Sequence, residues 1–145
     1  TLFYGVLDTK TGSLTYANAG HNPGYLVSSG VIDELGATGI PVGMLSDQVW
    51  TTAETTIPPG SALVLYTDGV TDAVDQKGDY YGEERLADSA RSHLTSSARD
   101  MRVGLMEDVR AFVGGAAQED DMTFLIMLRS WDGAADGQPD DDGFV

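Results

Sequence analysis

Two apolar stretches of this sequence carry acidic residues at one end. Residues 63–67 lead into Asp68, whereas Asp120 and Asp121 lead into residues 122–128. If the two stretches are neighbouring antiparallel strands, the end of the first lies beside the start of the second. Adjacent strands are about 5 Å apart, so Asp68 and Asp120 are predicted to lie close enough to share one hard cation.

Simpler interpretations of both acidic sequences stay open. Asp68-Gly69 is a common turn dipeptide, and Asp120 with Asp121 could cap the loop that leaves a helix. Turns alone, however, do not require that one apolar strand ends in an acid and that another begins directly after two acids. We therefore keep Asp68 and Asp120 as candidate metal ligands, with Gly69 and Asp121 as their neighbours.

The available side chains favour a cation that prefers oxygen ligands. The sequence has no cysteine, and its only histidines are His21 and His93. Carboxylates without thiolates suit Mn²⁺, Mg²⁺ or Ca²⁺ better than Zn²⁺, although zinc stays open. Such an ion can acidify a bound water and hold a phosphoryl oxygen. Metal-assisted hydrolysis is therefore the favoured reaction class.

An apolar strand followed by Asp-Gly-Val is also found in haloacid-dehalogenase phosphatases. Those enzymes need a nucleophilic Asp two residues before the Asp of the Asp-Gly pair, and Tyr66 stands at that position here. Because a tyrosine cannot form the aspartyl phosphate, the sequence disfavours this family.

His21 and Asn22 lie in a loop that follows an expected strand. A histidine there could orient a substrate or a water, but a hydrogen-bonded turn histidine explains the residue at least as well. We keep His21 and Asn22 as site-adjacent residues and assign no catalytic residue beyond the metal ligands. His93 lies at the edge of a helical apolar stripe and is interpreted as a boundary residue.

Composition limits the class of protein and its partners. The 145 residues suit one domain, and no apolar run approaches the roughly 20 residues that span a bilayer. We therefore expect a soluble protein without membrane contact, and the lack of cysteine fits a reducing, cytoplasmic setting. A formal charge of −15 argues against nucleic-acid binding, because that affinity comes mainly from Lys and Arg.

Apolar periodicity and turn residues predict the order of the elements. Expected strands are residues 2–8, 14–18, 25–27, 31–32, 49–57, 62–67 and 122–128. Expected helices are residues 83–94 and 98–113, the second of which is opened by Ser97 with Asp100 three residues later. Short glycine-containing loops join the first two pairs of strands, so most pairing should be antiparallel. The order indicates an α+β domain over residues 1–130. Residues 131–145 are rich in Gly and Asp, and we expect them to be a disordered acidic tail.

Short motifs follow one another along the chain in a fixed order. They are residues 1–8, 14–23, 39–43 (Gly-Ile-Pro-Val-Gly), 59–60, 65–71 (Leu-Tyr-Thr-Asp-Gly-Val-Thr), 81–86 and 120–123 (Asp-Asp-Met-Thr). The ordered set resembles the SpoIIE-type branch of the metal-dependent, type 2C serine/threonine protein phosphatases. The resemblance covers residues 1–130.

The resemblance implies a fold and an activity. The implied fold is an antiparallel β-sandwich flanked by helix pairs (αββα), with a Mn²⁺ or Mg²⁺ centre at one end that Asp68 and Asp120 help to ligate. The implied reaction is direct attack of a metal-bound hydroxide on phosphoserine or phosphothreonine. The implied substrate is a phosphorylated anti-anti-sigma-like protein, and an upstream sensor domain is expected in the full-length chain.

The sequence departs from the family pattern at two points. Asp72 stands where the family commonly has Glu, and the family's earlier motif, an Asp followed by Gly-His-Gly, is absent. That motif supplies the carboxylate that bridges two metals. We therefore expect this chain to be the C-terminal part of the catalytic domain, incomplete at its N-terminus and with little activity alone.

Two other functions stay open at this level. A degenerate phosphatase could keep the fold as a non-catalytic binding or regulatory module. An acidic chain of this kind could also be a Ca²⁺-dependent adaptor.

Overall fold

The computed structural model describes residues 1–94, 97–118 and 120–131, which form two antiparallel sheets and three helices. One sheet has the strand order β1-β2-β5, formed by β1 (Leu2–Leu7), β2 (Ser13–Ala19) and β5 (Ala53–Thr56). The other has the order β4-β3-β6-β7, formed by β3 (Gly24–Ser28), β4 (Val31–Leu35), β6 (Ala62–Tyr66) and β7 (Phe124–Leu128). The helices are α1 (Asp68–Thr71), α2 (Gly82–Ser92) and α3 (Ala98–Val113).

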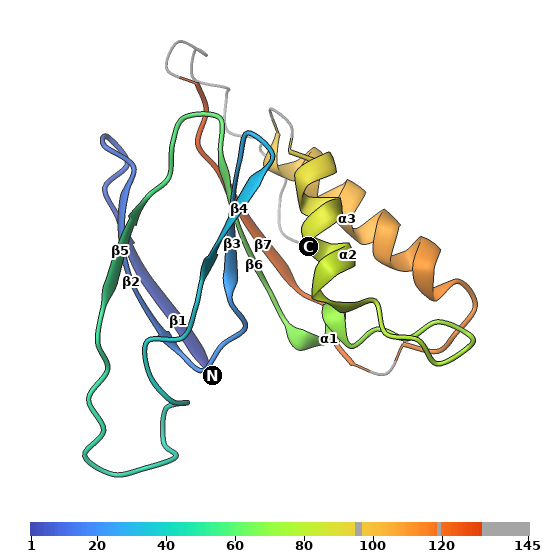
Figure 1. Ribbon diagram of the computed structural model, residues 1–145, viewed down its shortest axis with the longest axis horizontal. Coiled ribbons are helices and arrows are strands. Elements are labelled where there is room, and N and C mark those ends of the chain that lie inside the picture. The colour runs from blue at the N-terminus through green and yellow to red at the C-terminus, as the bar shows by residue number, and fades with distance from the viewer. Residues whose placement is uncertain (95–96, 119, 132–145) are drawn as a thin grey trace, which may run out of the picture.

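The two sheets face each other, and the helix pair α2–α3 covers the outer face of the four-stranded sheet (Figure 1). Alternation along β6 explains this layering. Leu63 faces the other sheet and packs near Leu14 and Tyr16, whereas Val64 and Tyr66 face the helices. A central strand that is apolar on both faces thus builds two cores, which confirms the predicted antiparallel α+β sandwich.

Helices cover only one of the two sheets in the described part of the chain. The outer face of β1 is exposed there, including the side chains of Leu2, Tyr4 and Val6. The implied helix pair on the β1-β2-β5 sheet is therefore not among the described residues (Figure 1). No helix in the described ranges is long and apolar enough to cross a membrane. Of the expected disordered tail, only Trp131 lies within these ranges; residues 132–145 lie outside them.

Both long helices match their predicted positions. The hydroxyl of Ser97 accepts a hydrogen bond from the Asp100 N–H, as expected of an N-cap, and α3 ends at Gly114, whose φ of 60° favours glycine. Met101, Leu105 and other residues of its apolar stripe are buried against the four-stranded sheet. Local capping and periodicity were therefore sufficient to predict these elements.

The predicted strand over residues 49–57 is wrong in its first half, because β5 begins only at Ala53. The Trp50 indole N–H donates to the Ile40 carbonyl at 2.7 Å, and the Thr51 hydroxyl donates to the Thr38 carbonyl at 3.0 Å. These bonds hold residues 50 and 51 against the preceding loop instead of a neighbouring strand.

Arg129, which follows β7, ties the two sheets together at one end. Its guanidinium donates to the carbonyls of Thr11 at 2.7 Å and Ile57 at 2.8 Å. A third bond reaches the Lys10 carbonyl at 3.1 Å. Charged donors that satisfy several carbonyls are among the stronger hydrogen bonds in proteins.

We expect Arg129→Met to lower the free energy of unfolding of the full-length protein by about 1–3 kcal/mol, because it leaves these carbonyls without their donor. Urea denaturation followed by circular dichroism measures the change. Arg102→Met, at an exposed position on α3, is the control and should shift the midpoint little. Equal midpoints for the two variants would show that Arg129 does not hold the sheets together.

Tyr66 places a hydroxyl in the sheet–helix core, where it makes no hydrogen bond of normal length and angle among the described residues, and its ring centroid lies 5.3 Å from that of Tyr25. Burial raises the pKa of Tyr66 above its ordinary value. Above about pH 10 the unfolded chain releases this proton while the folded chain keeps it, so stability should be complete below that pH and fall as the pH rises.

We therefore expect Tyr66→Phe to leave stability at pH 7 within about 1 kcal/mol of wild type and to reduce its loss above about pH 10. Thermal melts between pH 7 and pH 11 measure both effects. Tyr4→Phe is the control, because Tyr4 is 61% exposed. An unchanged alkaline transition in Tyr66→Phe would rule out Tyr66 as its source.

Candidate functional site

The two acidic sequences meet because β6 and β7 are antiparallel neighbours. Their pairing runs from Ala62 opposite Leu128 to Tyr66 opposite Phe124. The end of β6 therefore lies beside the start of β7, as the sequence predicted. The acids come just beyond this last pair, at the end of the sandwich opposite Arg129.

The Thr67 hydroxyl hydrogen-bonds the end of β6 to the segment that precedes β7. It donates to the Asp121 carbonyl at 2.9 Å and accepts from the Thr123 N–H at 3.0 Å. These bonds also explain why β7 begins at Phe124 and not at Met122, where the sequence predicted it. Sequence reasoning missed this role, because the first of these bonds joins residues 54 positions apart.

Asp68 is the first residue of α1, a one-turn helix where the sequence indicated a turn. Val70 fills the core from this helix, and the Thr71 hydroxyl donates to the Asp68 carbonyl at 3.1 Å. Asp68 itself is exposed. The buried side of α1 therefore fixes the backbone that carries an outward-facing carboxylate.

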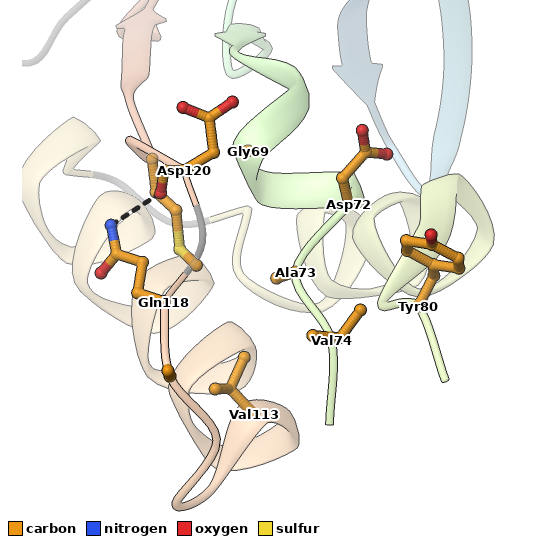
Figure 2. A pocket seen from close by; sticks show the side chains of 10 residues that line it. Gly69, Asp72, Ala73, Val74, Tyr80, Val113, Gln118 and Asp120 are labelled. Carbon is orange, nitrogen blue, oxygen red and sulfur yellow. Dashed lines mark hydrogen bonds between the residues drawn. The ribbon is translucent and has the colours of Figure 1, made fainter. Parts of the chain in front are cut away.

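Gly69 lets the second acidic segment approach α1 closely. A Cβ atom at this position would lie 2.5 Å from the Asp121 carbonyl oxygen and 3.3 Å from the Asp120 Cβ atom. Figure 2 shows Asp120 beside Gly69. Because Asp68 directly precedes Gly69, the carboxylates of Asp68 and Asp120 stand on backbones that touch each other.

Within the described part of the chain, each carboxylate has one oxygen that accepts no hydrogen bond. Asp68 Oδ1 accepts from the Gly69 N–H at 3.1 Å, and Asp120 Oδ1 accepts from the Asp121 N–H at 2.7 Å. Across the described ranges, no Lys, Arg or His forms an ion pair with either acid. Two carboxylates on touching backbone segments, with no basic partner among the described residues, suit a divalent cation.

The pair is not a complete ligand set. In residues 1–94, 97–118 and 120–131, no group of three or more His, Asp or Glu side chains could hold a metal ion. Mg²⁺ is commonly held by one or two carboxylates and several waters, so the donors present fit such an ion in part.

A cavity of about 310 Å³ is lined by Gly69 and Asp120, whereas Asp68 is not among its lining residues (Figure 2). Asp72 and Asp120 stand at its border on either side of Gly69, and Val113 is among its apolar lining residues. The side-chain amide of Gln118 donates to the Asp120 carbonyl at 2.8 Å, which helps to hold this border in place.

His21 lies near the end of β6, but its contacts are those of a turn residue. Its N–H donates to Asn18 Oδ1 at 2.8 Å, and its ring Nδ1 lies 3.2 Å from the Thr1 hydroxyl. Asn22, the next residue, is half-buried. Asn18 is fully buried and donates to the Leu35 carbonyl at 3.2 Å. Sequence reasoning missed Asn18, although a polar residue at an inward-facing strand position was a signal.

His93 is half-buried, as expected of a residue at the edge of an apolar stripe, and it caps the C-terminus of α2. Its Nε2 atom lies 2.9 Å from Asp108 Oδ2, and its ring lies against Gly104 of α3. Ser89 donates to the same carboxylate oxygen at 2.6 Å. These contacts join α2 to α3 and leave His93 outside the candidate site.

Solved structures with the same arrangement of sheets are phosphatase domains of the type 2C (PP2C) fold. The SiaA-PP2C domain of Pseudomonas aeruginosa matches with a TM-score of 0.72 and 24% identity, over 82% of this chain and 47% of that chain. The phosphatase domain of SpoIIE from Bacillus subtilis matches with a TM-score of 0.68 and 16% identity, over 90% and 56% of the two chains. These similarities establish the fold.

The chain belongs to the Stage II sporulation protein E (SpoIIE) family, whose sequence profile matches residues 1–130. Protein IcfG of Synechocystis is 34% identical over 131 residues, which cover 90% of this chain and 20% of that protein. Phosphoserine phosphatase RsbU of Bacillus subtilis is 27% identical over 131 residues, which cover 89% of this chain and 38% of that protein. The chain therefore spans less than two fifths of the length of either relative.

Proposed function

We propose that the full-length protein is a metal-dependent serine/threonine phosphatase that hydrolyses phosphoserine or phosphothreonine on a protein substrate. The observation that carries this proposal is the close approach of Asp120 to the backbone that bears Asp68, across the unsubstituted Cα of Gly69. Membership of the SpoIIE family supports it, as does the similarity to two phosphoserine phosphatases, RsbU and RsbP.

In this proposal, Asp68 and Asp120 hold Mn²⁺ or Mg²⁺ through the carboxylate oxygens that make no other bond. A bound ion of this type supplies Lewis-acid stabilisation of phosphoryl oxygens and activates water. Gly69 keeps the two acidic segments in contact, and Thr67 fixes their register. Neutralising two carboxylates by a cation also allows an acidic chain to accept an anionic phosphoryl group.

We propose that the substrate is a phosphorylated anti-anti-sigma-like protein. Support comes from the resemblance of the motifs and from the relatives RsbU and RsbP. A solved structure of the RsbU and RsbW domains of Rv1364c from Mycobacterium tuberculosis also matches, with a TM-score of 0.69 and 26% identity over 88% of this chain and 35% of that chain. We place the reaction in the cytoplasm, with which a chain without cysteine is compatible.

Metal removal tests the proposal directly. We expect the full-length protein to release inorganic phosphate from a phosphoserine protein in Mn²⁺ or Mg²⁺ and to lose this activity in EDTA, because the acids alone cannot neutralise the phosphoryl charge. Adding Mn²⁺ in excess of EDTA should restore the rate. Full activity in EDTA would contradict the proposal. Ca²⁺ serves as a control, because it is a cation of the same charge.

The alternative is a non-catalytic type 2C-like binding or regulatory module. Among the described residues no third ligand side chain accompanies Asp68 and Asp120, and a binding module would need none. Such a module would bind the phosphoprotein in Mn²⁺ without releasing phosphate. The same assay therefore separates the two functions.

A further inference from the structure

The connection between β4 and β5 exposes an unusual number of apolar side chains. Val42, Met44, Leu45 and Val49 are 57%, 65%, 63% and 78% exposed. We call residues 41–49 the apolar loop. Loops that face water are usually polar, and apolar residues gathered at one exposed place typically mark an interaction site.

The base of this loop is held in place, although its tip is exposed. The Trp50 indole donates to the Ile40 carbonyl at 2.7 Å, and the Thr38 N–H donates to the Asn18 carbonyl at 2.8 Å. Asn18 is itself fully buried in β2. A loop anchored in this way loses less conformational entropy when it binds a partner than a free loop does.

The base of the apolar loop and the acidic segments lie on either side of one cavity. The Pro41 ring lies against Gly20, where an added Cβ atom would come within 2.5 Å of it. The next residue, His21, lines a cavity of about 300 Å³ together with Thr67, whose hydroxyl is bonded to the Asp121 carbonyl. The loop therefore projects from the end of the sandwich that also carries α1 (Figure 1).

We propose that the apolar loop is the docking surface for the phosphoprotein substrate, where it binds an apolar patch beside the phosphorylated residue. The proposal rests on the proposed phosphatase function. A protein that presents a phosphorylated side chain to Asp68 and Asp120 has to cover this end of the sandwich, from which the loop projects.

The negative charge of both the chain and its phosphorylated substrate explains why their contact should be apolar. The chain carries a formal charge of −15, and phosphorylation adds negative charge to the substrate, so long-range electrostatics oppose their encounter. Asp47 is the one charged residue in the sequence of residues 41–49. Burial of the apolar side chains of this loop against the substrate would supply binding affinity that does not depend on charge.

The experiment compares two substrates of the full-length protein in Mn²⁺. One is a serine-phosphorylated anti-anti-sigma-like protein from the same genome, and the other is p-nitrophenyl phosphate, which has no protein surface that could dock on the loop. Val42→Ser and the double variant Met44→Ser/Leu45→Ser are compared with Val31→Ser. Val31 is a matched control, since it is 58% exposed in the β3–β4 hairpin, at the end of β3 away from His21.

We expect the double variant to raise KM for the phosphoprotein about tenfold and Val42→Ser to raise it about threefold, with kcat unchanged. Neither change should affect p-nitrophenyl phosphate, and Val31→Ser should affect neither substrate. Calorimetry of phosphoprotein binding to the same variants should show the same order of affinities, whether or not phosphate is released.

Four results would overturn the docking proposal. The first is an unchanged KM and affinity for the phosphoprotein in the double variant, and the second is an equal loss of activity on p-nitrophenyl phosphate. The third is no binding of the phosphoprotein to the wild-type protein. The fourth is a fall in the melting temperature or oligomer size of the double variant without a change in KM. The last result would show that the loop is covered by the protein itself or by a second copy. Failure of the proposed function is distinct, because neither substrate would then be hydrolysed in Mn²⁺.

Discussion

Replacing Asp120 by Asn in the full-length protein is expected to lower kcat/KM on a phosphoserine protein by at least about 10³-fold. The amide keeps the size of the side chain but removes the charge that holds a cation. Because Asp120 is exposed and its side chain bonds only the adjacent Asp121 N–H within the described ranges, the melting temperature without metal should change little. Asp68→Asn is expected to have the same effect.

Metal binding provides a readout that is independent of activity. Calorimetric titration with Mn²⁺ should show weaker binding in both variants than in wild type. The double variant Asp68→Asn/Asp120→Asn should lose little more activity than either single variant, because ligands of one ion act as a unit. Asp33→Asn, at an exposed position on β4, is the control. Full activity with unchanged Mn²⁺ affinity in Asp68→Asn would reject it as a ligand.

Gly69→Ala is expected to lower kcat/KM by about 10²-fold and the free energy of unfolding by about 1–3 kcal/mol. The added methyl group would lie 2.5 Å from the Asp121 carbonyl oxygen, so a backbone segment has to move. That movement separates Asp68 from Asp120. Phosphate release and urea denaturation of the full-length protein measure the two effects.

The matched control for Gly69→Ala is Gly36→Ala. No atom lies within 4 Å of a Cβ atom added at Gly36, and neither glycine has a positive φ, so the two substitutions differ in the space that they meet. Gly36→Ala should leave activity unchanged. If Gly69→Ala is as active as Gly36→Ala, the close approach of the two acidic segments is not required for catalysis.

Local patterns in the sequence predicted the elements that matter most for the site. β6 and β7 were predictable because their apolar residues are contiguous and end in acids, and α3 because its N-cap and apolar stripe lie within a few residues of each other. The first half of the strand predicted over residues 49–57 failed, since Trp50 bonds a residue 10 positions away. The alternation of apolar and polar residues does not indicate a hydrogen-bond partner in another loop.

The order of the motifs was enough to identify the family, and the apolar runs were enough to indicate that two acids stand at strand ends. The tertiary structure alone shows that Gly69 leaves room for the Asp121 carbonyl and that Thr67, directly after β6, bonds the segment that leads into β7. It alone also shows that the apolar loop projects from the same end (Figure 1). Each of these features depends on contacts between residues far apart in the chain, and such contacts are set by sheet register and packing, not by local residue preference.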